Sequence, residues 1–218
     1  MFESVTIIGA GRAGSAIAGR LRERGVDVRA EAELRLLCVP DSAIAEVAAA
    51  IRSGPWVAHV SGATPLAALA PHTRRFSVHP LQTLVRSRGP EQLDGAWGAV
   101  TAETPDAHVR AVWLAETLGL TPFDLADDAR ALYHAGAVIA SNFLVTLHRA
   151  AALLAADAGA PPAGLLPLMR RTIENDFELT GPIARGDRET VERHLAAIRA
   201  REPQLEPLYT ALAKATTA

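Results

Sequence analysis

The sequence predicts an α/β protein in which a doubly wound parallel sheet is followed by an all-helical region. Three observations support this fold class: a glycine-rich turn between a strand and a helix near the N-terminus, strand-like runs that alternate with helical segments as far as about residue 125, and helical segments alone beyond that point. We therefore expect two domains, residues 1–125 and residues 126–218.

The first strand, Val5–Ile8, runs directly into a GxGxxG turn, and the residues after the turn continue at helical spacing. Gly9 suits a tight turn, Gly11 lets backbone approach a pyrophosphate, and Gly14 lets the helix lie close to the strand. The first N–H groups of the helix then favour an anion. A glycine-rich turn that binds nothing is the alternative. The residues expected to bind a cofactor here are Gly9, Gly11, Arg12, Ala13 and Gly14.

Strands and helices alternate through the first domain, which implies parallel pairing with right-handed crossovers. The later strand-like runs are Leu34–Val39, Trp56–Val60, Phe76–Val78, Trp97–Thr101 and Thr121–Phe123. The helical segments are Arg12–Arg24, Ser42–Ile51, Pro65–Leu69 and Pro105–Leu118.

The second domain reads as long helices separated by Gly and Pro. The helices are Asp128–Asp157, Pro162–Glu178, Asp187–Arg201 and Pro203–Lys214. The first of them is apolar on more than one side, so it must be buried, and a domain of this size gives it limited cover. We therefore expect a homodimer formed through these helices.

Composition narrows the class of protein. The hydrophobic fraction of 49% is ordinary for a globular protein, and a net charge of -2 gives no basic field for nucleic acid. The single cysteine, Cys38, excludes a disulfide framework within one chain and suits a reducing compartment. No basic-then-apolar leader is found, and no stretch comes near 18 uncharged apolar residues. We expect a cytoplasmic protein that binds neither a membrane nor nucleic acid.

Six motifs, in this order and spacing, carry a resemblance to a known family. They are Gly9-Ala-Gly-Arg-Ala-Gly14, Leu37-Cys-Val-Pro-Asp41, His59-Val-Ser-Gly62, Ser77-Val-His-Pro-Leu-Gln-Thr83, Tyr133-His-Ala-Gly-Ala-Val-Ile-Ala-Ser-Asn142 and Gly181-Pro-Ile-Ala-Arg-Gly-Asp187. The chain resembles small bacterial proteins that join a Rossmann-like domain to a helical domain of unknown function. These are similar to pyrroline-carboxylate reductases, prephenate dehydrogenases and the 6-phosphogluconate-dehydrogenase-like group. The resemblance implies NAD(P)-dependent reduction of a small keto- or imino-acid.

The chain departs from this family at the strand Leu34–Val39. In the resembling proteins it corresponds to the fourth strand and lies beside the first, with two strands and their helices in between. Here only Gly25–Glu33 separate the first helix from this strand, and one parallel crossover needs about a dozen residues or more. The adenosine-side half of the sheet is therefore expected to be largely missing. Asp27, Arg29, Glu31 and Glu33 are interpreted as solvated loop charges. The expected cofactor is NADP or NAD, with a slight preference for NADP and binding that this truncation can weaken.

Ligands of doubly wound sheets bind at the carboxyl ends of the strands, where three motifs fall. Val39 and Pro40 are expected to lie against the cofactor, and Asp41 to cap the next helix. Ser61 and Gly62 would lie near the nicotinamide and substrate, with a plain tight turn as the alternative. The third motif, at the end of the next strand, contains His79.

The imidazole of His79 can hold a carboxylate or relay a proton. A structural histidine is the alternative. On a uniform helix, His134 and Ser141 lie within about 20° of each other and share a face with Asn142. Related hydroxyacid dehydrogenases carry a Lys at the position of Val138, so His134 replaces it as proton donor while Asn142 orients the substrate. A polar seam between helices is the alternative.

Arg185, between small residues of a predicted interhelical loop, could clamp a substrate carboxylate bidentately, or could belong to an ordinary loop. Two functional hypotheses follow. The first is an NAD(P)-dependent oxidoreductase that reduces a small carboxylate-bearing keto- or imino-acid. The second is a non-catalytic dimeric ligand-binding or sensor protein that has lost dinucleotide binding.

Overall fold

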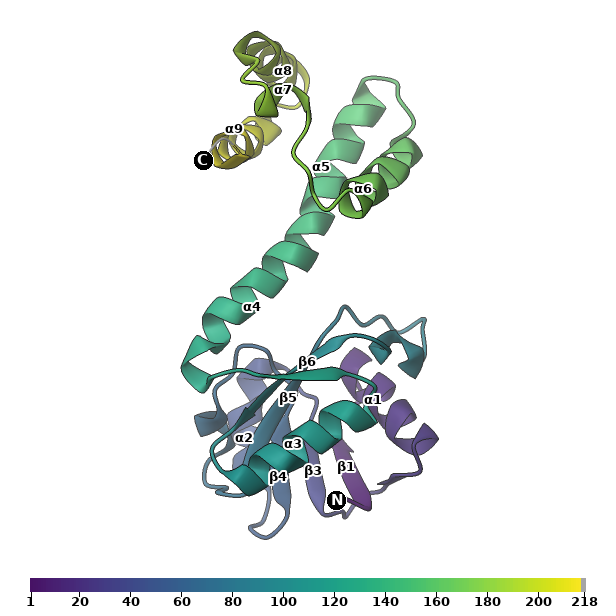
Figure 1. The fold of residues 1–218 in the computed structure, drawn as a ribbon, viewed down its shortest axis with the longest axis vertical. Helices are drawn as coiled ribbons and strands as arrows, with labels where there is room; N and C mark the ends of the chain where they lie inside the picture. Colours follow the sequence, from purple (N-terminus) through teal and green to yellow (C-terminus); the bar gives the residue numbers. More distant parts are fainter. Residues whose placement is uncertain (217–218) are drawn as a thin grey trace. The chain divides into compact units, whose positions relative to one another are not determined.

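The computed structural model describes residues 1–216, and the chain divides into two compact units, Met1–Ile139 and Ala140–Ala218. We call them the sheet unit and the helical unit and describe each by itself (Figure 1). The division falls later than the boundary predicted after residue 125. The first helix after that point begins with Arg130, whose side chain is buried in the sheet unit.

The sheet unit contains a seven-stranded sheet in the order β2-β1-β3-β4-β5-β6-β7. Its strands are β1 (Ser4–Ile8), β2 (Asp27–Val28), β3 (Leu34–Leu37), β4 (Trp56–His59), β5 (Arg75–Leu81), β6 (Trp97–Ala102) and β7 (Thr121–Asp124). The predicted α/β class is confirmed, and each of the six predicted runs contains a strand.

Helices cover both faces of the sheet. The main helices are α1 (Arg12–Glu23), α2 (Ile44–Ala50), α3 (Pro105–Thr117) and α4 (Arg130–Val138), with short 3-10 segments η1 (Asp41–Ala43), η2 (Leu66–Leu69), η3 (Pro90–Leu93) and η4 (Asp127–Ala129). The larger core lies where α1 and α3 pack on one face, around Ile17, Phe76 and Leu114 (Figure 1). The smaller core lies on the other face beneath α2 and η2.

One pairing differs from the prediction of an all-parallel sheet. β6 runs antiparallel to β5, with Leu81 opposite Trp97, whereas β7 is parallel to β6. The segment between these two residues contains only η3 and carries no helix across the sheet. Without such a crossover the chain re-enters beside the strand it left, which makes the pair antiparallel.

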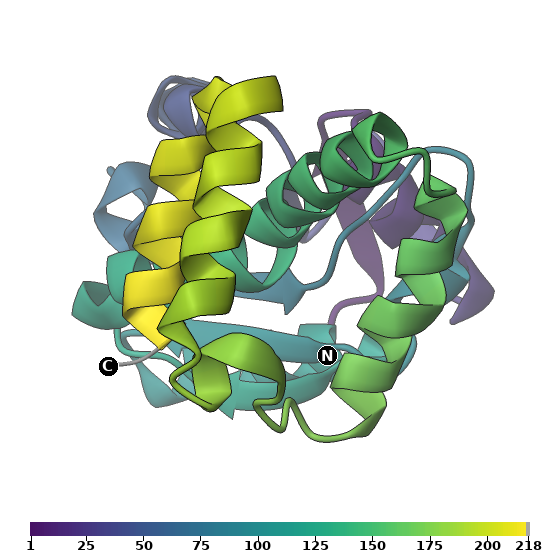
Figure 2. The same ribbon diagram turned by 90° about the horizontal axis from the view of Figure 1, so that it is seen from above.

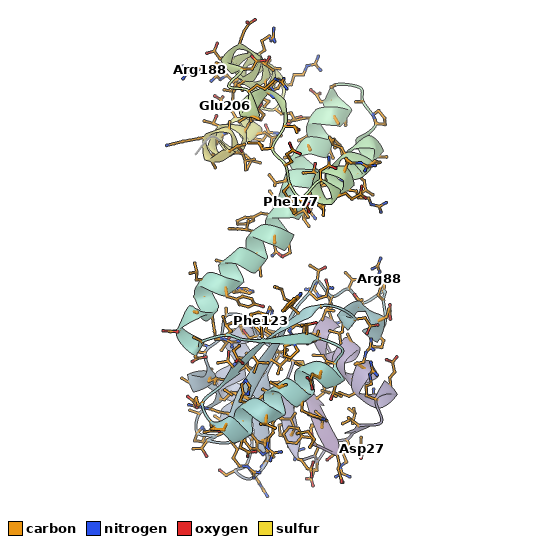
Figure 3. The ribbon with its side chains drawn as sticks, viewed as in Figure 1. Asp27, Arg88, Phe123, Phe177, Arg188 and Glu206 are labelled. Carbon is orange, nitrogen blue, oxygen red and sulfur yellow. The ribbon has the colours of Figure 1, made fainter. Side chains whose placement is uncertain are left out.

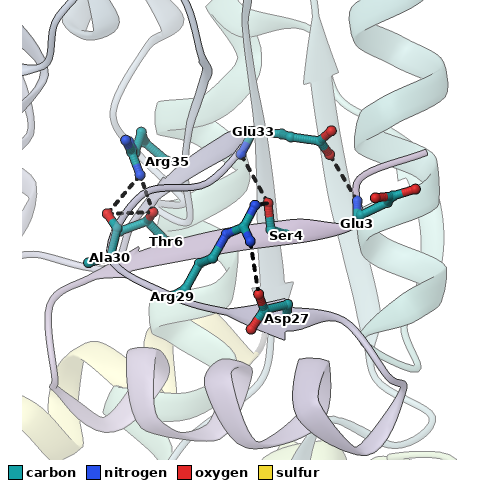
Figure 4. Close-up of polar contacts among 8 residues, drawn as sticks. All are labelled: Glu3, Ser4, Thr6, Asp27, Arg29, Ala30, Glu33 and Arg35. Carbon is teal, nitrogen blue, oxygen red and sulfur yellow. Dashed lines mark hydrogen bonds and ion pairs between the residues drawn. The ribbon is translucent and has the colours of Figure 1, made fainter.

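The truncated side of the sheet keeps a two-residue strand, β2, that the sequence did not predict. β2 pairs in parallel with β1, and residues 29–33 then cross one face of β1 to reach β3. Polar side chains of β1 face this loop: Arg29 donates to Ser4 Oγ at 3.2 Å, and Thr6 Oγ1 donates to the Ala30 carbonyl at 3.1 Å (Figure 4). The crossover is this short because β2 is only two residues long, so little chain is needed to return to the start of β3.

The helical unit has no strand among its described residues. A π-helical turn, η5 (Ile139–Phe143), joins α4 to α5 (Leu144–Asp157), and the later elements are η6 (Pro162–Gly164), α6 (Leu165–Glu174), α7 (Gly181–Ala184), α8 (Arg188–Arg201), η7 (Pro203–Leu205) and α9 (Glu206–Thr216). α8 and α9 lie side by side (Figure 2), joined by a 2.7 Å hydrogen bond between His194 Nδ1 and Tyr209 Oη.

The helical unit buries almost none of its side chains. Among its described residues only Ile198 is buried, while α5 and α6 expose apolar side chains along their lengths. Phe177, which is 70% exposed, follows α6 with a positive φ of 59° (Figure 3). Contiguous apolar exposure of this kind is typical of surfaces that contact another molecule.

One helical stretch, Asp127–Asp157, is long and apolar enough by length and composition to cross a membrane, with a hydropathy of 1.5. The expectation that no stretch comes near this limit is therefore wrong by this measure. It failed because His, Ser, Asn and Thr interrupt the apolar run without adding charge. A single such helix is weak evidence for a membrane span.

Candidate functional site

The glycine-rich turn links β1 to α1 as predicted. Gly9 has a φ of +114°, and a Cβ there would lie 2.4 Å from the Cys38 carbonyl oxygen. A Cβ at Gly14 would lie 1.9 Å from the Gly9 carbonyl oxygen. Both glycines are therefore required by backbone packing whether or not the turn binds anything.

Gly11 has no such structural reason to be glycine. A Cβ there would meet nothing within 4 Å, and the φ of -74° is open to any residue. Gly11 is also the N-cap of α1, which has no side-chain cap and no acidic residue in its first turn. The first N–H groups of α1, on Arg12, Ala13 and Gly14, have no partner within the helix, and Gly11 beside them leaves open the space that a side chain would fill. A helix start of this kind can bind a phosphate.

The turn after β4 is rigid, and its hydroxyl is already used. Ser61 Oγ accepts from the Thr64 N–H at 2.9 Å and contacts Thr64 Oγ1 at the same distance, and the Ser61 N–H donates to His59 Nδ1 at 3.2 Å. Ser61 is 7% exposed. The hydroxyl therefore holds the turn, and the contribution of this segment to a site is its backbone at Gly62.

Two imidazoles converge on Gly62. A Cβ at Gly62 would lie 2.7 Å from His134 Cδ2 and 2.9 Å from His79 Nε2. The two rings are nearly perpendicular, with centroids 6.1 Å apart. His79 lies inside β5 and not at its end, but β4 stops pairing at His59 opposite Ser77, so His79 extends past the carboxyl end of β4. The structure thus brings together three residues that the sequence predicted separately.

Tyr133, from α4, fixes the His79 ring. Its hydroxyl lies 2.8 Å from His79 Nδ1. Burial raises the pKa of Tyr133 to about 12, so the phenol keeps its proton near neutral pH. Burial, followed by the electrostatic effects of His134 and Arg130, lowers the pKa of His79 to about 4. His79 is therefore neutral near pH 7, with Nε2 toward Gly62.

A buried arginine that the sequence did not point to lies beneath this cluster. Arg130 is 1% exposed; it donates to Ser77 Oγ and Thr101 Oγ1, each at 2.8 Å, and to the Ser61 carbonyl. Its acceptors are hydroxyl and carbonyl oxygens, and it forms no ion pair among residues 1–216. The signal in the sequence for such an arginine is the presence of polar residues, here Ser77 and Thr101, on buried strands, because buried polar groups need hydrogen-bond partners.

The Arg130 charge also affects the pKa of His59, the neighbouring histidine of β4. Burial, together with this charge, lowers the pKa of His59 to about 3. The carboxylate of Asp41 opposes the effect on His79, which places a negative group on the same side of the sheet. The site therefore combines a buried cation with two neutral histidines.

Val39 and Pro40 follow β3 at the same edge, as predicted, with Pro40 exposed. The prediction that Asp41 caps the following helix is wrong. Pro40 is the N-cap of η1, Ala43 is the N-cap of α2, and neither helix has a side-chain cap. A 3-10 turn precedes α2, so the Asp41 carboxylate is left in the first turn of η1.

Ser141, Asn142 and Arg185 belong to the helical unit. Ser141 Oγ lies 3.1 Å from Asn142 Oδ1 within the π-helical turn η5. This turn interrupts the uniform period used to predict that Ser141 shares a face with His134, so that arithmetic does not apply. Arg185 is exposed at the end of α7, where the sequence predicted a loop. Asp187 caps α8 by accepting from the Thr190 N–H.

The fold and its sheet edge define a Rossmann-like α/β protein with a helical C-terminal region. A Rossmann-like domain model matches residues 22–83. The chain belongs to the family described as domain of unknown function DUF2520, whose model matches residues 97–216. No curated protein matches the sequence.

Solved structures share this fold at low identity. A protein of Bacteroides fragilis, described as a candidate NADP oxidoreductase, is 23% identical with a TM-score of 0.84, covering 98% of this chain and 97% of its own. Protein TM1727 of Thermotoga maritima is 22% identical with a TM-score of 0.75, covering 96% and 95%. A 1-pyrroline-5-carboxylate reductase of Streptococcus pyogenes is 14% identical with a TM-score of 0.62, covering 98% of both chains. At these identities the likeness is one of fold.

Proposed function

We propose that the protein is an NAD(P)-dependent oxidoreductase that reduces a small keto- or imino-acid. The observation that carries the proposal is Gly11, which packing leaves free to be any residue and which keeps the start of α1 open. Structural neighbours described as NADP-binding or as reductases support the same assignment. NADP is preferred slightly over NAD.

The cofactor's phosphates would be held by Gly11 and the N–H groups of Arg12, Ala13 and Gly14, with Gly9 shaping the turn. Val39, Pro40 and the Ser61 backbone would line its nicotinamide side. When bound, the nicotinamide dinucleotide supplies or accepts a hydride.

The chain's own residues would then handle the substrate and its proton. His134 donates the proton to the substrate's carbonyl oxygen or imine nitrogen, which would lie beside Gly62. His79, neutral near pH 7, donates a hydrogen bond to the same atom through Nε2. The absence of a side chain at Gly62 lets both rings approach its backbone. We propose Asn142, Ser141 and Arg185 of the helical unit as substrate-binding residues, Arg185 for a carboxylate.

Titration calorimetry with NADPH and NADH tests the proposal. We expect saturable binding below about 1 mM for the unaltered protein and at least tenfold weaker binding for Gly11→Asp, whose carboxylate repels phosphate. Gly164→Asp is the matched control, because a Cβ at Gly164 also meets nothing within 4 Å. No saturable binding at millimolar cofactor would overturn the proposal.

The second candidate is a non-catalytic ligand-binding or sensor protein that has lost dinucleotide binding. The two-residue β2 favours it, because the strand that normally supports the adenosine is almost absent. Arg29, which follows β2, is held by Ser4 Oγ and Asp27, so it offers no free fork for a 2′-phosphate. The same titration separates the two candidates.

We further propose that the protein is a cytoplasmic homodimer in which a second copy covers the helical unit. The single buried side chain, Ile198, among the described residues of that unit supports this. The same cover would keep the apolar stretch Asp127–Asp157 out of a membrane. Sedimentation in detergent-free buffer tests it: a dimer supports the proposal, and a monomer or a species that needs detergent contradicts it.

A further inference from the structure

A cavity of about 610 Å³ lies at the amino ends of the strands, the edge of the sheet opposite to the candidate site. Residues just before β1, β3, β4 and β5 line it, together with Arg35 of β3, Trp56 of β4 and Arg110 of α3. Every lining residue belongs to the sheet unit. Its volume is in the range of small-molecule pockets.

Two arginines at this cavity are held in place by neutral oxygens. Arg35 donates to Thr6 Oγ1 and, at 2.8 Å, to the Ala30 carbonyl (Figure 4). Arg74 donates to the Gly54 carbonyl at 2.8 Å. Neither forms an ion pair with any residue of the described chain. Each guanidinium is thus held through one nitrogen, Nη1, while its charge and its other N–H groups stay available.

Two more arginines add positive charge to the same wall. Arg110 lies with its Cζ 4.8 Å from the Trp56 ring centroid, and Arg74 lies 5.1 Å from the same ring. Arg29 lines the cavity as well and pairs with Asp27 at 3.3 Å. Arg110 in turn pairs with Asp106 at 3.1 Å, so among the described residues Arg35 and Arg74 are the two lining arginines without an ion-pair partner. An anion in the cavity would compensate their positive charge.

The acidic side chains that line the cavity do not neutralise Arg35 or Arg74. Glu33 Oε2 accepts from the Glu3 N–H at 2.9 Å (Figure 4), and among the described residues neither Glu31 nor Glu33 forms an ion pair with either arginine. We propose that this cavity binds a small anion carrying two or more phosphate groups. Planar guanidinium forks match phosphate oxygens two at a time, and the volume exceeds what a single phosphate would fill.

Titration calorimetry with inorganic pyrophosphate in 150 mM salt tests this site, with adenosine diphosphate as the arm that separates a nucleotide from a free polyphosphate. We expect one pyrophosphate at this cavity and at least tenfold weaker binding for the double variant Arg35→Gln/Arg74→Gln. The matched control is Arg22→Gln/Arg24→Gln, which removes the same charge from the exposed end of α1 and should leave the affinity unchanged.

The Gly11→Asp variant separates this site from the proposed dinucleotide site and should keep the pyrophosphate binding of the cavity. Loss of all binding in Gly11→Asp alone, equal losses in both double variants, or no binding at all would overturn the proposal. Arg74→Gln alone guards against misfolding, since Arg74 is exposed and anchors no strand side chain; it should weaken binding with an unchanged Tm.

Discussion

The sheet unit and the helical unit solve the problem of apolar surface in different ways. The sheet unit buries its apolar side chains in two cores of its own, one on each face of the sheet. The helical unit buries one side chain among its described residues and leaves the others half-buried or exposed. A similar apolar content thus encodes a self-sufficient core in one region and, as we propose, an interface in the other.

The largest expected effect is on the core of the sheet unit. Phe76 is fully buried and stacks on Phe2 with ring centroids 6.3 Å apart. Phe76→Ala should lower the free energy of unfolding by about 3–5 kcal/mol at any protein concentration. Urea denaturation at two concentrations measures this; a loss below about 1 kcal/mol would mean that this core is not self-sufficient.

The next largest effect is expected on the proposed dimer, from substitutions on the exposed face of α6. Leu166 and Ile173 are 49% and 50% exposed, so Leu166→Glu/Ile173→Glu should keep the sheet unit folded and weaken the proposed dimer at least 100-fold by sedimentation. Val109→Glu in α3 is the matched control, because Val109 is 53% exposed in the sheet unit. Equal dimers in both variants would place the interface elsewhere.

The glycine turn should separate structural from ligand-facing positions. Gly14→Ala should cost about 1–3 kcal/mol, because its Cβ would lie 1.9 Å from a carbonyl oxygen. Gly11→Ala should change stability by less than about 0.5 kcal/mol, because its Cβ has open space. Thermal unfolding of both variants checks this, and a costly Gly11→Ala would mean that packing, not a ligand, requires this glycine.

The pH dependence of the free energy of unfolding should come from the sheet unit. The pKa of His79 is lowered to about 4 from an ordinary 6.5, so between these values the unfolded chain binds the proton and the folded chain does not. Stability is therefore full above pH 6.5 and lost as the pH falls toward 4, by on the order of 1–2 kcal/mol from this side chain.

Urea denaturation at pH 7 and pH 5 measures this loss. His79→Gln should reduce the dependence without abolishing it, because burial and the Arg130 charge lower the pKa of His59 to about 3 and His59 therefore acts in the same direction. The same slope in both proteins would show that His79 does not contribute to the effect.

Most of the fold could be predicted from periodicity, because each strand is an apolar run and the glycine turn has its strand and helix on either side. β2 could not, since two residues give no periodic signal. Arg130 was missed because arginines are usually solvated. Gly62, His79 and His134 were predicted one by one, but only the register of β4 against β5 shows that they meet. The π-helical turn at Ser141 and Asn142 leaves no mark in the sequence.

A crystal structure with NADPH tests the central proposal most directly. We predict the diphosphate within hydrogen-bond distance of the Arg12 and Ala13 N–H groups and the nicotinamide beside Gly62 and His79. Density for the cofactor only in the arginine-lined cavity at the opposite edge of the sheet, or none at saturating NADPH, would contradict the account.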